Sequence, residues 1–208
     1  MSFDLAVWYE TAPITVDVAD AWLAALYESE VPEGITPRPE IAAFVEDLRA
    51  AAPALEPTVG ADFVLMSFTA DELRQTVHEL AARHGLVCYD PQTERVAQPP
   101  PVIEGDELVL TAPDGSLYVD PDPELVAGTV QNLDAHSFFA ILERAGSHYV
   151  QVAYDADGHH LERREGSADR HFHTTIPRLA DAVPAFAAFA AGEQGWEKRY
   201  TWTRLELQ

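Results

Sequence analysis

The part of the chain that most clearly specifies its fold is residues 137–175, SFFAILERAGSHYVQVAYDADGHHLERREGSADRHFHTT. Strand-forming residues alternate there with three short segments, 145–147, 156–158 and 166–169, each with the Gly or Asp that tight turns favour. These turns separate four predicted strands, Ser137–Arg144, His148–Asp155, His159–Glu165 and Arg170–Thr175. Because such short connections join antiparallel neighbours, the stretch predicts a four-stranded antiparallel meander.

One helix and one strand downstream are expected to complete this sheet. A helix that begins near Asp181, with Pro184 in its first turn, carries Phe186 on an apolar face. Tyr200–Leu207 predicts a last strand. Residues 128–208 are therefore expected to form a ββββαβ domain, in which one helix covers one face of an antiparallel meander sheet.

The first half of the chain alternates strands with amphipathic helices. Apolar runs predict strands at Phe3–Tyr9, Phe63–Phe68 and Leu86–Tyr89. Helical spacing of apolar residues predicts helices at Thr15–Glu30, from Pro39 toward Pro53, and from Thr69 to Gly85. The resulting order for residues 1–97 is βααβαβ, and the last two strands are expected to pair in parallel as a βαβ unit. The whole chain is predicted to be an α+β protein with two domains.

A proline-rich and acidic segment, residues 98–127, lies between the two domains. Gln98 and Pro99–Pro101 have linker chemistry, because consecutive prolines are stiff and cannot sit inside a sheet. Residues 107–111 and 116–120 flank the turn tripeptide Pro113-Asp114-Gly115, which predicts a hairpin. The prediction is thus a linker with a hairpin over residues 98–127, followed by the domain 128–208.

Charge is the strongest compositional signal. The 208 residues include 13 Lys plus Arg and 35 Asp plus Glu, so the formal net charge is −22. Residues 1–127 alone carry 24 acidic and 5 basic residues. A surface of this sign repels phosphate, so the composition argues against a nucleic-acid partner and favours a basic protein partner.

Membrane insertion and secretion are not expected. The longest uncharged apolar run, Ala182–Ala191, is shorter than the ~18 residues that a spanning helix needs. The first ten residues carry Asp4 and no basic residue, which is unlike a secretory signal. The single cysteine, Cys88, cannot form an internal disulfide. We therefore expect a cytoplasmic protein without contact to a membrane.

Six of the eight histidines fall within or beside the meander, and this clustering is the main candidate for a site. If Glu165 pairs with Arg170 across the turn, Arg164 faces His171 and Glu162 faces His173. Side chains alternate along a strand, so one solvent-facing side of the sheet is expected to carry five candidate partner-binding residues, His160, Glu162, Arg164, His171 and His173.

Two alternative chemistries deserve a place beside partner binding. His171, His173 and Glu162 could ligate a metal, since two His at i and i+2 beside a carboxylate is a feasible geometry. Arg164 next to them would repel a dication, and we expect no bound metal and no cofactor. Cys88 with His84 could form a nucleophile and base, but an apolar strand is where a thiol usually packs as a core residue, so we expect a buried, inert Cys88.

Several blocks of residues 128–208 resemble a known family. They are Phe139–Arg144, Gly146 with Tyr149–Val152, Leu161–Gly166, and the helix Ala182–Gly192 with Trp196 and Trp202 after it. Together they resemble the first-numbered family of immunity proteins from bacterial polymorphic toxin systems. The resemblance implies a small α+β protein that binds and blocks a cognate toxin, including toxins that act on nucleic acid. Phe3–Trp8 and His84–Gln92 resemble uncharacterised actinobacterial proteins, which implies no function.

The sequence therefore predicts a non-enzymatic acidic binding protein, an immunity-type inhibitor of a basic toxin domain. Trp202, in an aromatic group with Trp196 and Tyr200, is a sixth candidate for partner binding, with core packing as its other role. Two alternatives stay open: a small metal-dependent or orphan enzyme that uses the histidine-rich side of the sheet, and an accessory domain of unknown partner.

Overall fold

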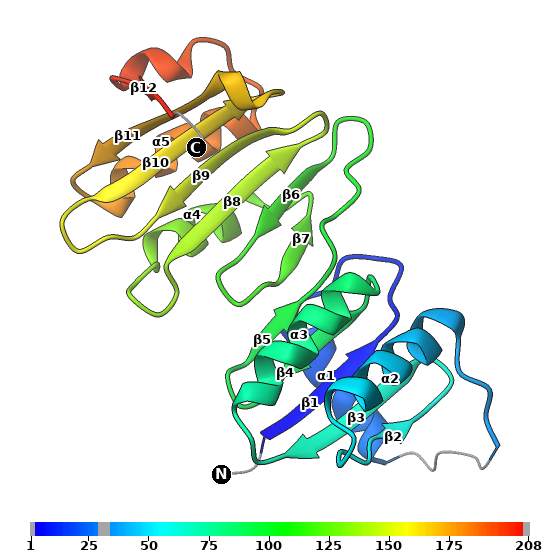
Figure 1. Ribbon diagram of the computed structural model, residues 1–208. Coiled ribbons are helices and arrows are strands. Elements are labelled where there is room, and N and C mark those ends of the chain that lie inside the picture. Colours follow the sequence, from blue (N-terminus) through cyan, green and yellow to red (C-terminus); the bar gives the residue numbers. More distant parts are fainter. Residues whose placement is uncertain (1–2, 29–33, 206–208) are drawn as a thin grey trace. The chain divides into compact units, whose positions relative to one another are not determined.

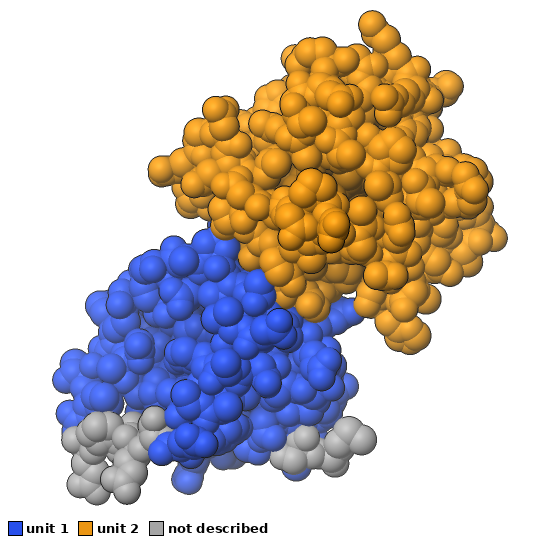
Figure 2. All heavy atoms as spheres, turned by 180° about the vertical axis from the view of Figure 1, so that it is seen from behind, with its two compact units in different colours: residues 1–100 blue, residues 101–208 orange. Residues whose placement is uncertain are grey.

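A computed structural model describes residues 3–28 and 34–205, apart from the side chain of Glu72. The chain forms two compact units, residues 1–100 and 101–208 (Figure 2). Each unit has its own sheet and its own core, and each is described by itself (Figure 1).

Unit 1 is built on a five-stranded sheet in the order β2-β3-β1-β4-β5. Its strands are β1 (Phe3–Trp8), β2 (Thr58–Val59), β3 (Phe63–Phe68), β4 (Val87–Asp90) and β5 (Arg95–Ala97). All pairs are antiparallel, and β1 lies between β3 and β4. The prediction that β3 and β4 pair directly in parallel is therefore wrong.

The reason for the central place of β1 lies in its two apolar faces. Leu5 and Val7 belong to one core of unit 1, and Ala6 and Trp8 belong to the other. A strand that buries side chains on both sides is stable in the middle of a sheet and costly at its edge. The α3 crossover from β3 to β4 consequently passes over β1.

Three helices cover the two faces of this sheet. The helix α1 (Val16–Tyr27) packs Leu23 against Trp8, while α2 (Pro39–Ala51) and α3 (Glu72–Arg83) pack on the opposite face with Leu5 and Val7 (Figure 1). Thr15 caps α1 by accepting a hydrogen bond from the Val18 N–H. Glu30, the expected end of the first helix, lies outside the described residues. The helix α3 begins at Glu72, three residues after Thr69.

Unit 2 contains a seven-stranded sheet in the order β12-β11-β10-β9-β8-β6-β7, with every pair antiparallel. Its strands are β6 (Leu108–Thr111), β7 (Leu117–Val119), β8 (Phe139–Arg144), β9 (His148–Ala153), β10 (His159–Glu165), β11 (His171–Ile176) and β12 (Thr203–Arg204). The predicted meander is confirmed as β8 to β11. The last strand is shorter than predicted, and its expected end at Leu207 lies outside the described residues.

Two helices, not one, cover the sheet of unit 2. Both α4 (Pro123–Gln131) and α5 (Val183–Ala190) lie on the same face, where Val130 and Phe186 pack with Leu142 and Leu161 (Figure 1). Short 3-10 segments, η1 (Ala168–Arg170), η2 (Leu179–Asp181) and η3 (Trp196–Arg199), connect the later elements. The face opposite α4 and α5 carries no helix among the described residues of unit 2. We call it the outer face.

The segment 98–127 differs from the expected linker. Its predicted hairpin is present as β6 and β7, but β6 pairs with β8 and so belongs to the sheet of unit 2. Asp122 caps α4 by accepting from the Leu125 N–H at 2.8 Å, and Pro123 is in the first turn of that helix. Asp122 and Pro123, within the segment predicted as a linker, therefore start a helix, because Pro fits the first turn, where its missing N–H costs nothing. Residues 98–107 lie between β5 and β6.

Candidate functional site

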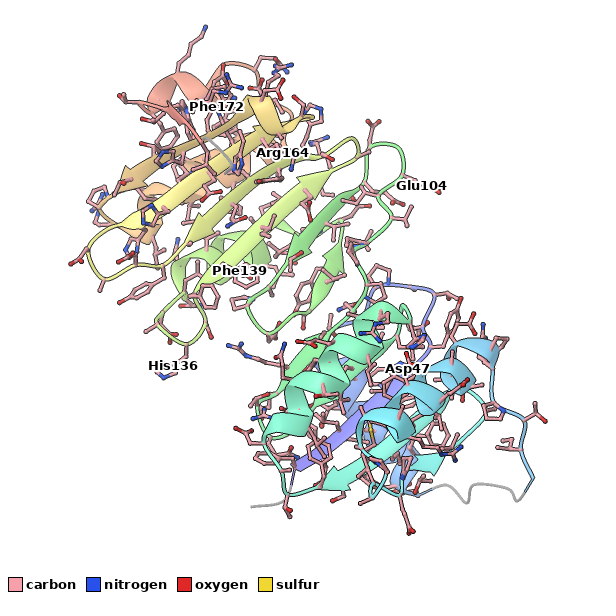
Figure 3. The ribbon with its side chains drawn as sticks, viewed as in Figure 1. Asp47, Glu104, His136, Phe139, Arg164 and Phe172 are labelled. Carbon is pink, nitrogen blue, oxygen red and sulfur yellow. The ribbon has the colours of Figure 1, made fainter. Side chains whose placement is uncertain are left out.

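The candidate site lies on the outer face of unit 2, across strands β8 to β11. The register pairs Glu162 with His173 and Arg164 with His171, as predicted (Figure 3 labels Arg164 and, on the neighbouring strand, Phe172). Leu161 and Val150 point into the core under the helices, so alternation places their strand neighbours on the outer face. We call this set of outer-face residues the histidine face. Its members are His160, Glu162, Arg164, His171, His173, Tyr149 and Glu143.

His171 is the buried centre of the histidine face. Its side chain contacts Glu162, with 2.9 Å between Nε2 and Oε2, and Tyr149, with 3.0 Å between Nε2 and the phenol oxygen. The residue is only 5% exposed, so the expectation of a fully solvated face is wrong at this position. The physical reason is that β11 has β10 on one side and β12 on the other, and the long side chains of Glu162 and Tyr149 lie against the ring.

The two ring nitrogens of His171 have different surroundings. Its Nε2 lies between the Glu162 carboxyl group and the Tyr149 hydroxyl, whereas its Nδ1 is buried without a hydrogen-bond partner. The cluster therefore works as a fixed polar contact between β9, β10 and β11.

Two further side chains of the histidine face are partly dehydrated. Burial raises the pKa of Tyr149, the charge of Glu162 adds to that rise, and Arg164 opposes it. Glu143 lies opposite Tyr149 in the register, and burial raises the pKa of its carboxyl. Polar groups that are held in place and partly desolvated can form stronger and more selective contacts than freely hydrated ones.

The remaining histidines of the chain's cluster are dispersed. His160 is 45% exposed, and its Nε2 lies 3.5 Å from Asp155 Oδ2. His173 is paired with Glu162 on one side and Thr203 on the other. His159 contacts the Tyr154 ring and alternates away from the histidine face. Three of the six clustered histidines thus share this face.

The geometry offers no ligand set for the alternative metal site. Within residues 3–28 and 34–205, no three His, Cys, Asp or Glu side chains come together as a metal ion requires. His171 and Glu162 are close to each other, but Arg164 occupies the position paired with His171. The metal hypothesis stays without structural support.

Trp202 does not join the other five candidates. Its indole N–H donates to the Glu197 carbonyl at 2.7 Å, and its ring packs against Trp196 and Tyr200. The guanidinium of Arg163 lies 5.1 Å from the Trp202 ring centroid. Because Arg163 alternates with Glu162 and Arg164 along β10, Trp202 belongs to the side opposite the histidine face.

Sequence reasoning missed Tyr149 and Glu143. The signal that could have found them is the turn at residues 145–147, which sets the β8–β9 register in the same way that residues 166–169 set the β10–β11 register. Counting back from that turn pairs Glu143 with Tyr149, and the β9–β10 turn then pairs Tyr149 with Arg164.

Cys88 is buried, as predicted, at 1% exposure. Burial raises the pKa of its thiol, and the charge of Asp90 adds to this rise, so the reactive thiolate is disfavoured. His84 contacts Asp47, with 3.0 Å between Nε2 and Oδ2. The proposed pairing of Cys88 with His84 as nucleophile and base is not formed.

Comparison of the chain with protein-family models, with curated proteins and with solved structures found no match. In the part of the chain that the structure describes, none of the helices has the length and apolar character needed to span a membrane.

Proposed function

We propose that this chain is a non-enzymatic acidic binding protein, an immunity-type inhibitor of a basic toxin domain that acts on nucleic acid. The partner docks on the outer face of unit 2. The toxin class rests on the resemblance of the β8–β11, α5 and Trp196–Trp202 blocks to the immunity family. The basic partner rests on charge.

One observation carries the proposal: residues 101–143 contain no basic residue. This segment supplies β6, β7 and β8, which are three neighbouring strands at one edge of the seven-stranded sheet, and α4, which covers the face opposite the outer face. Its nine acidic residues are Glu104, Asp106, Glu107, Asp114, Asp120, Asp122, Glu124, Asp134 and Glu143. A field of one sign over these three strands attracts a cationic surface and repels phosphate.

The requirements of such an inhibitor match this charge. A domain that acts on nucleic acid needs a basic cleft, and a protein of opposite sign associates with that cleft quickly and selectively. The histidine face next to the acidic strands supplies fixed polar groups. It also has an aromatic end, since Phe138 is 48% exposed and its ring lies 5.1 Å from that of Phe139 (labelled in Figure 3). Aromatic groups beside ordered polar ones are common interface anchors.

The enzymatic alternative is weaker on geometry. A general base must reach the proton that it removes, and His171 is 5% exposed with its Nε2 shared between Glu162 and Tyr149. The same arrangement suits a rigid recognition surface. We therefore keep binding as the proposed function.

The proposal requires a toxin gene beside the gene for this chain, and co-expression of the two proteins tests it. We expect survival of the host, a stable complex on purification, and an association rate that falls as salt rises. The variant Glu104→Lys/Asp106→Lys changes two exposed acidic residues of the segment and should slow association by about tenfold at low salt.

A matched variant, Asp157→Lys/Asp169→Lys, makes the same change of charge at two exposed turn positions outside residues 101–143. Its effect on the association rate should be smaller. Absence of a complex with the co-expressed toxin domain, or equal effects of the two double variants, would contradict the proposed docking.

A further inference from the structure

A pocket of about 480 Å³ lies in unit 2 where the β8–β9 and β10–β11 turns meet the segment after α5. Four of the chain's twelve arginines line it, Arg144, Arg163, Arg164 and Arg170. Strand alternation places the side chains of Arg144 and Arg163 on the helix-covered side of the sheet, whereas that of Arg164 belongs to the histidine face. Three carboxylates, those of Glu165, Glu193 and Glu197, line it as well, so four positive and three negative charges leave the pocket with one net positive charge in a chain of net charge −22.

Two of these guanidinium groups are held firmly. Nη2 of Arg144 donates to the carbonyls of Phe189 and Ala190, at 3.1 and 2.7 Å, at the end of α5. The Arg163 guanidinium lies 4.5 Å from the Phe172 ring centroid and 5.1 Å from that of Trp202. Both groups are therefore ordered before any ligand arrives, which lowers the entropy cost of binding.

A carboxylate of the protein itself is already bound by two arginines of the pocket. Glu165 bridges Arg163 and Arg170, with one carboxylate oxygen on Nη1 of Arg163 and the other on Nη2 of Arg170. The side chains of Glu165 and Arg170 are 31% and 62% exposed, so this bridge is accessible from solvent. Partial burial opposes ionisation of Glu165, but the two arginines outweigh it and lower the pKa of its carboxyl.

The hydrogen-bonding capacity of the pocket exceeds what the bridge uses. A guanidinium has five N–H donors, and Arg163 and Arg170 each place a single terminal nitrogen on Glu165. Nε of Arg163 is buried without a partner. Phe189 and Trp196 add apolar wall to the pocket, which is far larger than an inorganic oxyanion needs.

We propose that this pocket binds a small organic anion. Its phosphate or carboxylate group replaces Glu165 on Arg163 and Arg170, and its apolar or aromatic body lies against Phe189 and Trp196. Planar guanidinium groups bind both oxyanions through paired hydrogen bonds. Tyr149 and Arg164 of the histidine face also line the pocket, but the titration below uses this chain without a partner and so tests the proposal separately from docking on the outer face.

Calorimetric titration of the full chain with phenyl phosphate, benzoate and inorganic phosphate tests the proposal. We expect saturable one-to-one binding of phenyl phosphate or benzoate. The two aromatic probes show whether phosphate or carboxylate is the preferred group, and inorganic phosphate should bind more weakly because it lacks the apolar body. No saturable binding of any probe at millimolar concentration would overturn the proposal.

Three variants locate the binding. Arg170→Gln should weaken it by about tenfold, the usual effect of losing a charge-assisted hydrogen bond. Glu165→Gln should strengthen it, because a neutral amide competes less well for the arginines. The matched control is Arg178→Gln, since Arg178 is an exposed arginine paired with Asp181 and does not line the pocket. Equal affinities of the two arginine variants, or no gain in Glu165→Gln, would refute the proposed site.

Discussion

Among the described residues of unit 1, the most buried charged side chain is that of Asp90, which is 1% exposed at the end of β4. It forms an ion pair with Arg74 of α3, and its Oδ1 accepts from the Gln92 N–H at 3.0 Å. The Arg74 guanidinium also lies 4.9 Å from the Phe3 ring centroid. The pair thus connects a helix to two neighbouring strands. Loss of Arg74 would leave the buried Asp90 carboxylate without its counter-charge, whereas Arg74 is 27% exposed and also pairs with Asp71.

Removal of the arginine should therefore be costly. We expect Arg74→Met to lower the free energy of unfolding by about 3 kcal/mol, because Asp90 is left buried without its counter-charge. Arg83→Met is the control, since Arg83 is 62% exposed and pairs with an exposed Asp47 at 3.3 Å. Its effect should stay within about 0.5 kcal/mol. Urea unfolding at neutral pH measures both, and equal losses would show that Asp90 does not depend on Arg74.

Glu165 provides a pH-dependent contribution to the stability of unit 2. The pKa of its carboxyl is lowered in the folded state, so the ionised group stabilises the fold above the ordinary glutamate pKa. This contribution is lost as pH falls through the lowered folded-state pKa. Glu165→Gln should melt roughly 2–4 °C below the parent at pH 7, and this difference should be smaller near pH 3, below the ordinary glutamate pKa. Thermal melts at the two pH values measure this, and a constant difference would contradict the ionic origin.

At the scale of elements, substitution of two glycines by Ala is expected to change stability in opposite directions. Gly60 lies in the β2–β3 turn, where an added Cβ would be 2.2 Å from Cε1 of the buried Phe63. Gly128 lies inside α4, where an added Cβ meets nothing within 4 Å. Gly60→Ala should destabilise unit 1 by about 1–3 kcal/mol through overpacking, and Gly128→Ala should stabilise unit 2 by about 0.5–1 kcal/mol. Chemical unfolding of each variant measures the change in the free energy of unfolding. Changes of the same sign for the two variants would contradict these predictions.

Elements with clear turn chemistry were predictable from the sequence, and those that depend on tertiary pairing were not. The Gly-containing turns at residues 156–158 and 166–169 set the register of β9, β10 and β11, so the side chains of the histidine face could be assigned in advance. The central position of β1 could not, because it depends on packing against both cores of unit 1. The helix α4 was not predicted from the sequence, because Asp-Pro patterns are typical both of turns and of the first residues of helices.

In the candidate site, too, the features set by turns were predictable from the sequence and those set by tertiary contacts were not. Pairing of Glu162 with His173 and of Arg164 with His171 followed from the turn alone, whereas the burial of His171 depends on Tyr149 from another strand pair. The arginine pocket was not predictable, because Arg144, Arg163 and Arg170 meet only when α5 and two sheet turns come together. The residue pattern along the chain predicts the strand register within a meander. It does not predict which turn contacts which helix end.

At the scale of the whole molecule, the two units have separate cores. The two apolar clusters of unit 1 draw their residues from Leu5 to Val96, and the cluster of unit 2 draws its residues from Leu110 to Phe186. Residues 98–107 connect β5 to β6 without regular secondary structure, and Val102 within them is 84% exposed. A segment with this exposure is where a protease finds accessible backbone.

Limited digestion with subtilisin should therefore cut first within residues 98–107 and leave two resistant fragments close to residues 1–100 and 101–208 in size. Because β6 pairs with β8, residues 108–127 should be protected as part of the second fragment. Mass spectrometry of the fragments gives the cut sites, and circular dichroism of the separated fragments shows whether each keeps its structure. A strand within a seven-stranded sheet must unfold locally before a protease can bind and cleave it. First cuts within residues 108–127 would therefore indicate that the whole segment 98–127 is a linker, as the proline pattern predicts.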